Sequence, residues 1–437
     1  MNPTSSARAI GARRRATVTV AAGLVALAAC SSTPSSGAMP TTAGTVATTS
    51  PMSGPSDRDE PGYATALRPV LRDIVTSMAM PSALVLVRSS TFGDATFQFG
   101  TRELGTHEPP TTTDRDRIGS LTKTMTGTVI LQLAEEGKLS LGDPISNYRP
   151  DVPNGDNITI AHLLDMRSGL YGYDLDPGFL HAVDDDPERI WSPDDLLAYG
   201  YAKPALFPPG TAYDYSNTNY ILLGLVMEQV TGQTASELFK ERLFDPLGMD
   251  DTTLPALDDT SLPTPYIHGY MFTSAEKGGS PDAALSPDQQ QAAADGTLLP
   301  ADWSHANPSW GWTAGSVIST ADDLVAWARA VADGELLGAD MQAQRDASLQ
   351  PMDATQPGGV VYGSGMLRAG SYYGHAGLIF GYSSQFLRDP ETDTTIVVLT
   401  GLTLSPEGGL PSAALIVPVV DELARTAATN STTTATG

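Results

Sequence analysis

The sequence contains a single cysteine, Cys30, among its 437 residues. No intrachain disulfide can therefore form. Basic residues are also scarce, because 25 Lys and Arg stand against 50 Asp and Glu, which gives a net charge of −25 and a pI near 4.4. A field of this sign repels nucleic acid and anionic lipid headgroups. We therefore expect no nucleic-acid partner.

Histidine is rare, and its spacing does not suit a metal. The six histidines form no His-Glu-x-x-His or similar pattern, and the sequence has no glycine-rich phosphate loop. The acidic run Asp184-Asp185-Asp186 with Glu188 could hold a cation, although a solvated loop is the better interpretation. We expect no metal site and no cofactor.

The apolar stretch near the N-terminus, residues 16–29, is too short for a membrane-spanning helix. It follows a cluster of arginines, as the apolar region of a signal peptide does. The stretch ends in Leu27-Ala28-Ala29-Cys30, which resembles the lipobox of bacterial lipoproteins. We therefore predict a signal peptide over residues 1–29, a lipid on Cys30, and anchoring to the outer face of a bacterial cell membrane. The alternative is cleavage after residues 26–28, which would give a secreted protein.

Composition divides the rest of the chain into three parts. Residues 30–61 are small, polar and rich in proline, so we expect a flexible tether. Residues 62–426 hold enough apolar sequence for one folded domain with a subdomain, since 41% of the chain is hydrophobic. Residues 427–437 are rich in threonine and are predicted to be a disordered tail.

Helical and strand periodicities suggest how this domain is built. Helices are predicted over residues 63–78 and around 415–423, and a hairpin over 83–87 and 96–99. Strand patterns return only near 373, 385–387 and 395–399, and helices dominate between. The predicted fold is α+β, of the α/β sandwich type. It combines an antiparallel sheet from both chain ends, flanking terminal helices and an inserted, mostly helical subdomain.

The pattern Ser120-Leu121-Thr122-Lys123 is the strongest chemical signal in the chain. On a helix, this spacing puts a hydroxyl and an amine on one face. A nearby base can then activate the serine, and a buried lysine can serve as that base. Ser274-Ala275-Glu276-Lys277 has the same spacing, but it lies in a polar stretch that we interpret as a loop. Apolar periodicity after Ser120 favours the first pattern.

Two further segments carry polar groups suited to one cleft. Tyr215 and Asn217 stand two residues apart in a loop before the apolar run 221–226. The phenol can pass a proton, and the amide can hydrogen-bond a substrate carbonyl. Residues 372–379 are predicted to form a strand containing His375, and its glycines would let a ligand approach the backbone.

Together, in this order, Ser-x-x-Lys, Tyr-Ser-Asn and His-x-Gly resemble the serine hydrolases typified by class C β-lactamases. That family also includes D-alanyl-D-alanine carboxypeptidases and related esterases. The similarity continues in residues 131–144, 158–164, 315–324 and 362–365, and covers roughly residues 63 to 425. It implies the same fold, with the active site at the junction of sheet and helical subdomain.

The resemblance implies a role for each motif residue. Ser120 would be the acylated nucleophile, and Lys123 would share the general-base work with Tyr215. Asn217 would orient the substrate. The reaction would be acyl transfer through an acyl-enzyme that water resolves, on a small-molecule or peptide substrate of the cell envelope.

The His-x-Gly segment would complete the site. His375 would support proton transfer or bind the polar end of the substrate, and Gly377 would lie against it. The backbone N–H groups of Ser120 and Leu378 would form the oxyanion hole.

Two departures from the family pattern bear on the substrate. Relatives usually carry hydroxyl residues where this chain has Ala376 and often where it has Leu378, and these hydroxyls help to hold a carboxylate. Neither side chain can donate a hydrogen bond. A carboxylate there would be desolvated without compensation, which favours a neutral acyl group, as in esters or amides. The segment Asp165-Met166-Arg167 also departs from the pattern, and we attribute that change to core packing.

Other interpretations remain at this point. The enzyme could instead be a D-alanyl-D-alanine carboxypeptidase or a weak β-lactamase, or the chain could be a non-catalytic lipoprotein that keeps the fold.

Residues 171–208 and 255–309 are expected to form cleft walls. Trp310 and Trp312 could line the cleft or pack in the core.

Overall fold

The computed structural model describes residues 60–278, 283–356 and 358–434. The predicted signal peptide, Cys30 and the tether up to residue 59 lie outside these residues. Within the described ranges, no helix has both the length and the apolar character needed to cross a membrane.

A single antiparallel sheet forms the centre of the molecule. Its eight strands follow the order β2-β1-β12-β11-β10-β9-β8-β7. Strands from the two ends of the chain pair within it, where β1 lies beside β12 and Val85 pairs with Val398. The strands are β1 Ser82–Ser89, β2 Ala95–Gly100, β7 Gln350–Pro351, β8 Val361–Gly363, β9 Met366–Ala369, β10 Tyr372–Ile379, β11 Tyr382–Asp389 and β12 Thr394–Thr400.

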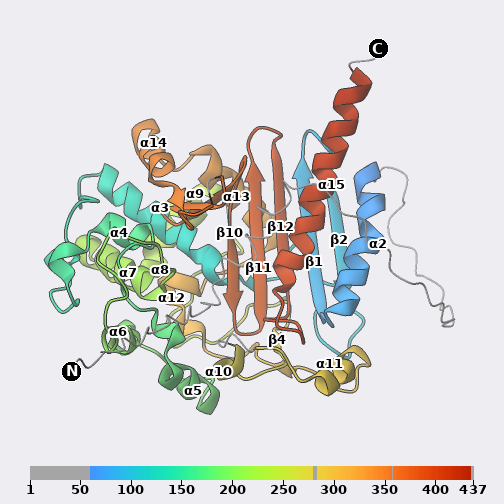
Figure 1. The fold of residues 1–437 in the computed structure, drawn as a ribbon, viewed down its shortest axis with the longest axis horizontal. Coiled ribbons are helices and arrows are strands. Elements are labelled where there is room, and N and C mark those ends of the chain that lie inside the picture. Colours follow the sequence, from blue (N-terminus) through green and yellow to red (C-terminus); the bar gives the residue numbers. More distant parts are fainter. Residues whose placement is uncertain (1–59, 279–282, 357, 435–437) are drawn as a thin grey trace, which may run out of the picture.

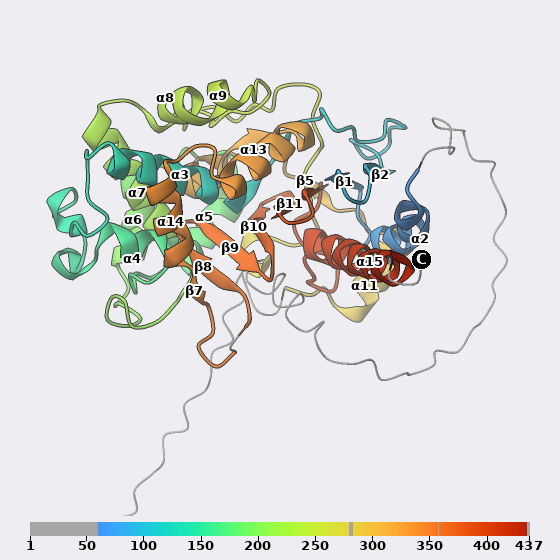
Figure 2. The same ribbon diagram turned by 90° about the horizontal axis from the view of Figure 1, so that it is seen from above.

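Helices cover both faces of this sheet, so its central strands are buried on both sides. The terminal helices α2 Gly62–Ser77 and α15 Pro411–Thr434 pack together against one face (Figure 1). Helix α13 Ala321–Asp333 packs on the other, as the view from above shows (Figure 2). Every residue of β11 and β12 is buried. The predicted α+β fold, with a sheet from both chain ends and flanking terminal helices, is confirmed.

A mostly helical region is inserted between β2 and α13, and most of it lies at one end of the sheet, whereas α11 lies near α2 at the other end (Figure 1). Its longest helices are α3 Thr122–Glu135 and α7 Asn217–Thr231, which pack against each other. Its shorter α-helices are α4 Ile160–Leu164, α5 Pro177–Asp185, α6 Pro193–Tyr201, α8 Ala235–Phe239, α9 Asp245–Leu247, α10 Ala275–Gly278, α11 Pro287–Ala294 and α12 Trp312–Gly315.

Single turns and one later helix complete the elements. The 3-10 turns are η2 Gly119–Leu121, η3 Ile145–Asn147, η4 Gly155–Asn157, η5 Tyr173–Leu175 and η7 Pro308–Trp310, and η6 Lys240–Phe244 is a π-helix. Helix α14 Ala339–Ser348 follows α13.

Three details differ from the predictions. Two small sheets, β3 Asp116–Arg117 with β6 Ile318–Ser319 and β4 Tyr270–Met271 with β5 Ala301–Asp302, lie where only helices and loops were expected. Strands of two residues are too short to show an alternating pattern.

The other two corrections concern helices. Residues 275–278 form helix α10 rather than a loop, because Ser274 and Asp184 accept hydrogen bonds from its first backbone N–H groups. Helix α15 continues to Thr434, so residues 427–434 are helical where a disordered tail was predicted. Threonine permits helix continuation once a helix is nucleated on a packed apolar face.

Candidate active site

Ser120 lies in the 3-10 turn η2, directly before helix α3. The side-chain hydroxyl of Thr122 holds this turn in place through two hydrogen bonds. Thr122 Oγ1 donates to Gly119 O at 2.8 Å and accepts from the backbone N–H of Val317 at 3.2 Å. Ser120 is therefore held at a helix N-terminus, where free N–H groups and the helix dipole favour negative charge. This placement agrees with the sequence prediction.

Lys123 reaches back one turn to the serine. Its Nζ lies 2.9 Å from Ser120 Oγ and donates to Ala314 O at 2.6 Å. The side chain is fully buried. Burial lowers the pKa of Lys123 to about 7, and the carboxylate of Asp174 partly opposes this shift. A substantial fraction of the amine is thus neutral at physiological pH and can accept a proton.

Helix α12 supplies the carbonyl that holds this amine in place. Thr126 Oγ1 on α3 donates to Thr313 O at 2.6 Å, and Thr313 Oγ1 donates to Tyr220 O on α7 at 2.9 Å. Gly224 permits the close packing of α7 and α12, because a Cβ there would lie 2.3 Å from Thr313 Oγ1. The position of Lys123 therefore depends on three helices at once.

Tyr215 approaches the same pair from the loop before α7. Lys123 Nζ lies 5.0 Å from the centroid of its ring. Burial raises the pKa of Tyr215, and the nearby Ser120 hydroxyl opposes that rise only in part. The phenol is consequently protonated at neutral pH and can donate a proton.

Met166 holds the loop that carries Tyr215. Its carbonyl accepts from Asp214 N at 3.0 Å, and its sulfur lies 3.4 Å from Ser216 N and 3.6 Å from Asn219 Nδ2. The two residues flanking Tyr215 are thus both bonded to one methionine, which adopts a positive φ of 58°. The sequence indicated only a departure from the family pattern at Met166. Its role is packing, as predicted, but packing directly behind the site.

Asn217 begins helix α7 and faces an acidic side chain that the motifs did not indicate. The carboxylate of Asp174, in η5, accepts a hydrogen bond from the Asn217 side chain. Asp214 lies near Asp174, and burial, reinforced by that neighbouring charge, raises the pKa of Asp214 to about 6. Segment 171–208 therefore contributes to the site, as expected of a cleft wall.

His375 is fully buried in β10, and its ring lies 6.3 Å from Tyr215 and 5.9 Å from Tyr362, between centroids. Nδ1 lies 2.6 Å from Ala376 O and must donate to it, which leaves Nε2 as an acceptor. Burial, with the nearby Lys123 charge, lowers the pKa of His375 to about 3. The position that many relatives fill with lysine is therefore uncharged here.

The end of β10 presents backbone to the nucleophile. Strand β9 pairs with β10 only up to Gly374, and η2 packs beside the residues that follow. A Cβ on Gly119 would lie 2.7 Å from Leu378 N, and one on Gly377 would lie 2.1 Å from Ile118 O. The structure thus brings the two backbone segments of the predicted oxyanion hole together.

The second Ser-x-x-Lys pattern, the acidic run and the two tryptophans singled out in the sequence contribute no group to the pair of Ser120 and Lys123. Ser274 is exposed and precedes α10, Lys277 is a partly exposed residue of α10, and the Asp184 carboxylate accepts from the first two backbone N–H groups of that helix. No group of three or more potential metal-ligating side chains occurs in residues 60–278, 283–356 and 358–434. Trp312 is buried, and Trp310 packs on Phe380 at 4.8 Å between ring centroids.

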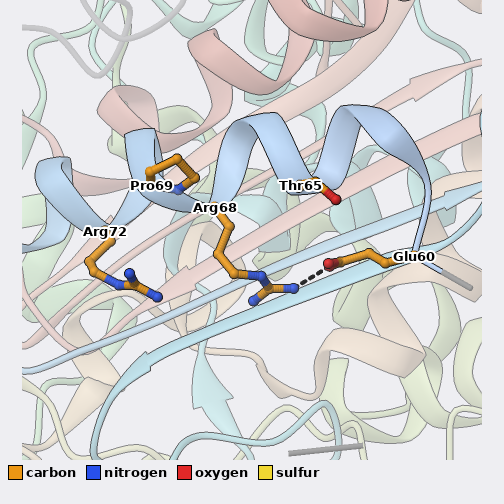
Figure 3. A pocket seen from close by; sticks show the side chains of 5 residues that line it. All are labelled: Glu60, Thr65, Arg68, Pro69 and Arg72. Atoms are coloured by element: carbon orange, nitrogen blue, oxygen red, sulfur yellow. Dashed lines mark hydrogen bonds and ion pairs between the residues drawn. The ribbon is translucent and has the colours of Figure 1, made fainter. Parts of the chain in front are cut away.

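An open hollow of about 370 Å³ lies along α2, and none of the site residues described above lines it (Figure 3). Arg68 and Arg72 line it, and Arg68 forms an ion pair with Glu60. Its lining holds no candidate nucleophile paired with a buried base.

Known proteins share both the sequence pattern and the fold. The chain is 27% identical over 267 residues to the putative penicillin-binding protein PbpX of Bacillus subtilis, covering 61% of this chain and 56% of that protein. It is 26% identical to protein flp of Staphylococcus aureus strain COL, over 66% of this chain and 53% of flp. The chain thus spans little more than half the length of these relatives.

Solved structures match over most of both chains. A D-stereospecific amidohydrolase from Streptomyces has a TM-score of 0.67 and 28% identity, covering 81% of this chain and 97% of that one. The D-amino acid amidase of Ochrobactrum anthropi, at 22% identity and a TM-score of 0.66 over 83% of this chain and 99% of its own, shares the fold. The family model described as Beta-lactamase matches residues 70–418. The chain therefore belongs to the beta-lactamase family of serine hydrolases.

Proposed function

We propose that the protein is a cell-envelope hydrolase, lipid-anchored through Cys30, that cleaves esters or amides of acyl groups without a carboxylate. Ser120 is the nucleophile. The observation that carries the proposal is the buried lysine amine 2.9 Å from the serine hydroxyl. A pKa near 7 makes this amine a usable base at the pH of the cell surface.

The proposed reaction begins when Ser120 Oγ attacks the substrate carbonyl and Lys123 Nζ takes the hydroxyl proton. The backbone N–H groups of Ser120 and Leu378 stabilise the oxyanion, each contributing on the order of 3 kcal/mol. The carbon–nitrogen or carbon–oxygen bond then breaks, and the leaving group takes the proton. Water attacks the acyl-enzyme in the same way and regenerates Ser120.

Lys123 rather than Tyr215 is proposed as the proton acceptor in acylation. The pKa of Tyr215 is raised by burial, so the phenol is a proton donor at neutral pH. It is placed to pass its proton to the leaving group, and the Lys123 ammonium then returns the serine proton to the phenolate, so that both groups regain their starting states.

The preference for a substrate without a carboxylate rests on charge. His375 is neutral, and Ala376 and Leu378 offer no side-chain donor. The acidic side chains of Asp174 and Asp214 lie on the side of Tyr215 and Asn217. The similarity to a D-stereospecific amidohydrolase supports an amide substrate. The similarity to PbpX supports the alternative, a D-alanyl-D-alanine carboxypeptidase or weak β-lactamase.

A panel of aryl esters, aryl amides, D-alanyl-D-alanine peptides and a cephalosporin tests the proposal. We expect turnover of esters and amides, weak or no β-lactam hydrolysis, and a fluorophosphonate label on the wild type. Ser120→Ala should lose the label and reduce turnover by about 10⁴-fold or more. Rapid cephalosporin turnover would favour the alternative. Absence of both label and turnover would favour a non-catalytic binding protein.

A further inference from the structure

Three buried oxygen atoms on residues near Lys123 and Tyr215 lack hydrogen-bond donors. They are Asp174 Oδ1, Asp214 Oδ2 and Asn217 Oδ1, and no partner for them occurs in the part of the chain that the structure describes. All three accept hydrogen bonds when the two carboxyl groups are ionised, and these two then carry negative charge. Buried acceptors without donors are costly, so such a group requires a ligand or water that donates.

These acceptors adjoin the reacting groups. The carboxyl group of Asp174 interacts with the Asn217 side chain and influences the pKa of Lys123 electrostatically. Asp214 directly precedes Tyr215, whose phenol interacts with Ser120. A group bound to the three oxygens would therefore lie close to Lys123 and Tyr215, the residues that move protons in the proposed reaction.

The local fold does not account for these side chains. Asp176, not Asp174, caps helix α5 through its carboxylate. The backbone N–H of Asp214 bonds to Met166 O without help from its own side chain. The nearby cation, Lys123, directs its Nζ to Ser120 Oγ and Ala314 O instead.

We propose that Asp174, Asp214 and Asn217 bind a primary ammonium group on the acyl part of the substrate, so that the enzyme acts on amino-acyl amides or esters. An ammonium offers three N–H donors and one positive charge, which match three acceptors and an acidic environment. The inference rests on the proposed function and deepens it. It changes the expected acyl group from neutral to cationic, still without a carboxylate.

Paired substrates that differ only in the amine test this inference. The kcat/KM values of alanyl p-nitroanilide, for whichever enantiomer reacts faster, and propionyl p-nitroanilide are compared at about pH 7, where the amine is largely protonated. The wild type should prefer the alanyl compound by about tenfold or more. Asp174→Asn should reduce this ratio by about tenfold, and Asp214→Asn should reduce it less.

The ratio isolates the ammonium contact, because any effect of Asp174→Asn on Lys123 acts on both substrates alike. Asp186→Asn removes the same charge from an exposed residue beyond α5 and should leave the ratio unchanged. A wild-type ratio near one, or a ratio unaffected by both site variants, would overturn the inference. If Asp174→Asn does not fold, Asp214→Asn still decides the question.

The same measurements separate this inference from the proposed function. Turnover of p-nitrophenyl butyrate with Ser120-dependent labelling, but without preference for the amine, contradicts only the ammonium site. Loss of all turnover and labelling contradicts both proposals.

Discussion

The chemistry of the site depends on two side chains whose protonation changes near neutral pH. The pKa of Lys123 is lowered to about 7 and that of Asp214 is raised to about 6, both mainly by burial. His375, with a pKa of about 3, stays neutral throughout. The pH dependence of catalysis should therefore report on the lysine and its acidic neighbours rather than on the histidine.

The first prediction concerns the pH profile. A base works in its deprotonated form, so kcat/KM for an uncharged aryl ester should fall as pH decreases through about 7. Asp174 raises the pKa of Lys123, so Asp174→Asn should move this limb to lower pH. Initial rates across the pH range measure the shift. A limb that moves to higher pH would contradict the assignment, and Asp186→Asn serves as the charge-matched control.

Single residues were predictable where they belong to short motifs. Ser120 and Lys123 share a helix turn, so their spacing in the sequence already predicted contact. The contacts of Met166 and Asp174 with the site were missed because they join separate segments, with Met166 bonded to a residue 50 positions later. Such a contact depends on how loops and helices pack, which local periodicity does not contain.

At the scale of elements, the close approach of η2 and β10 shapes the oxyanion hole. Gly119 has a φ of 54°, which only glycine adopts without strain, and its backbone lies against Leu378 N. The two proposed N–H donors thus come from a turn and a strand that touch without intervening side chains.

The second prediction uses two glycines with similar backbone angles. Gly119→Ala should lower kcat/KM by about 100-fold or more, because its Cβ would lie 2.7 Å from Leu378 N and separate the donors. Gly137→Ala, at φ 70° with open space around it, should cost about 1 kcal/mol of stability and leave kcat/KM unchanged. Steady-state kinetics and thermal unfolding distinguish the two. Equal kinetic effects would show that backbone strain alone is responsible.

The third prediction concerns the loop that carries Tyr215. Met166→Leu removes the sulfur that accepts from Ser216 N and Asn219 Nδ2. We expect kcat to fall by about tenfold through misplacement of Tyr215, with little change in KM, and stability to fall by about 1 kcal/mol. Met227→Leu alters an equally buried methionine on α7 and should preserve kcat. Identical kcat values in the two variants would limit Met166 to a structural role.

Long elements were predictable because their periodicity extends over several turns or pleats. The terminal helices, the first hairpin and strands β10 to β12 were all predicted near their observed positions. The two-residue strands β3 to β6 were not, because they form only where segments already brought together by packing exchange hydrogen bonds. The small helix α10 likewise depends on a carboxylate from α5.

At the scale of the whole molecule, the fourth prediction concerns attachment to the membrane. Cys30 lies outside the described residues, so its lipidation stays a prediction from the sequence. Cys30→Ala should move the protein from the membrane fraction to the soluble or secreted fraction, while ester turnover by the purified protein stays the same. Fractionation followed by immunoblotting measures this. Continued membrane association of the variant would contradict the predicted anchor.

The seam between β1 and β12 has a consequence for how the protein is made. Ser89 Oγ lies 2.8 Å from Thr394 Oγ1, a contact across 305 positions, and β1 is paired along its length with β12. The central sheet cannot close until ribosomal synthesis has passed residue 400. Until then the N-terminal helix and hairpin lack the surface that buries them. A nascent chain in this state therefore has no complete sheet until its last strand has been made.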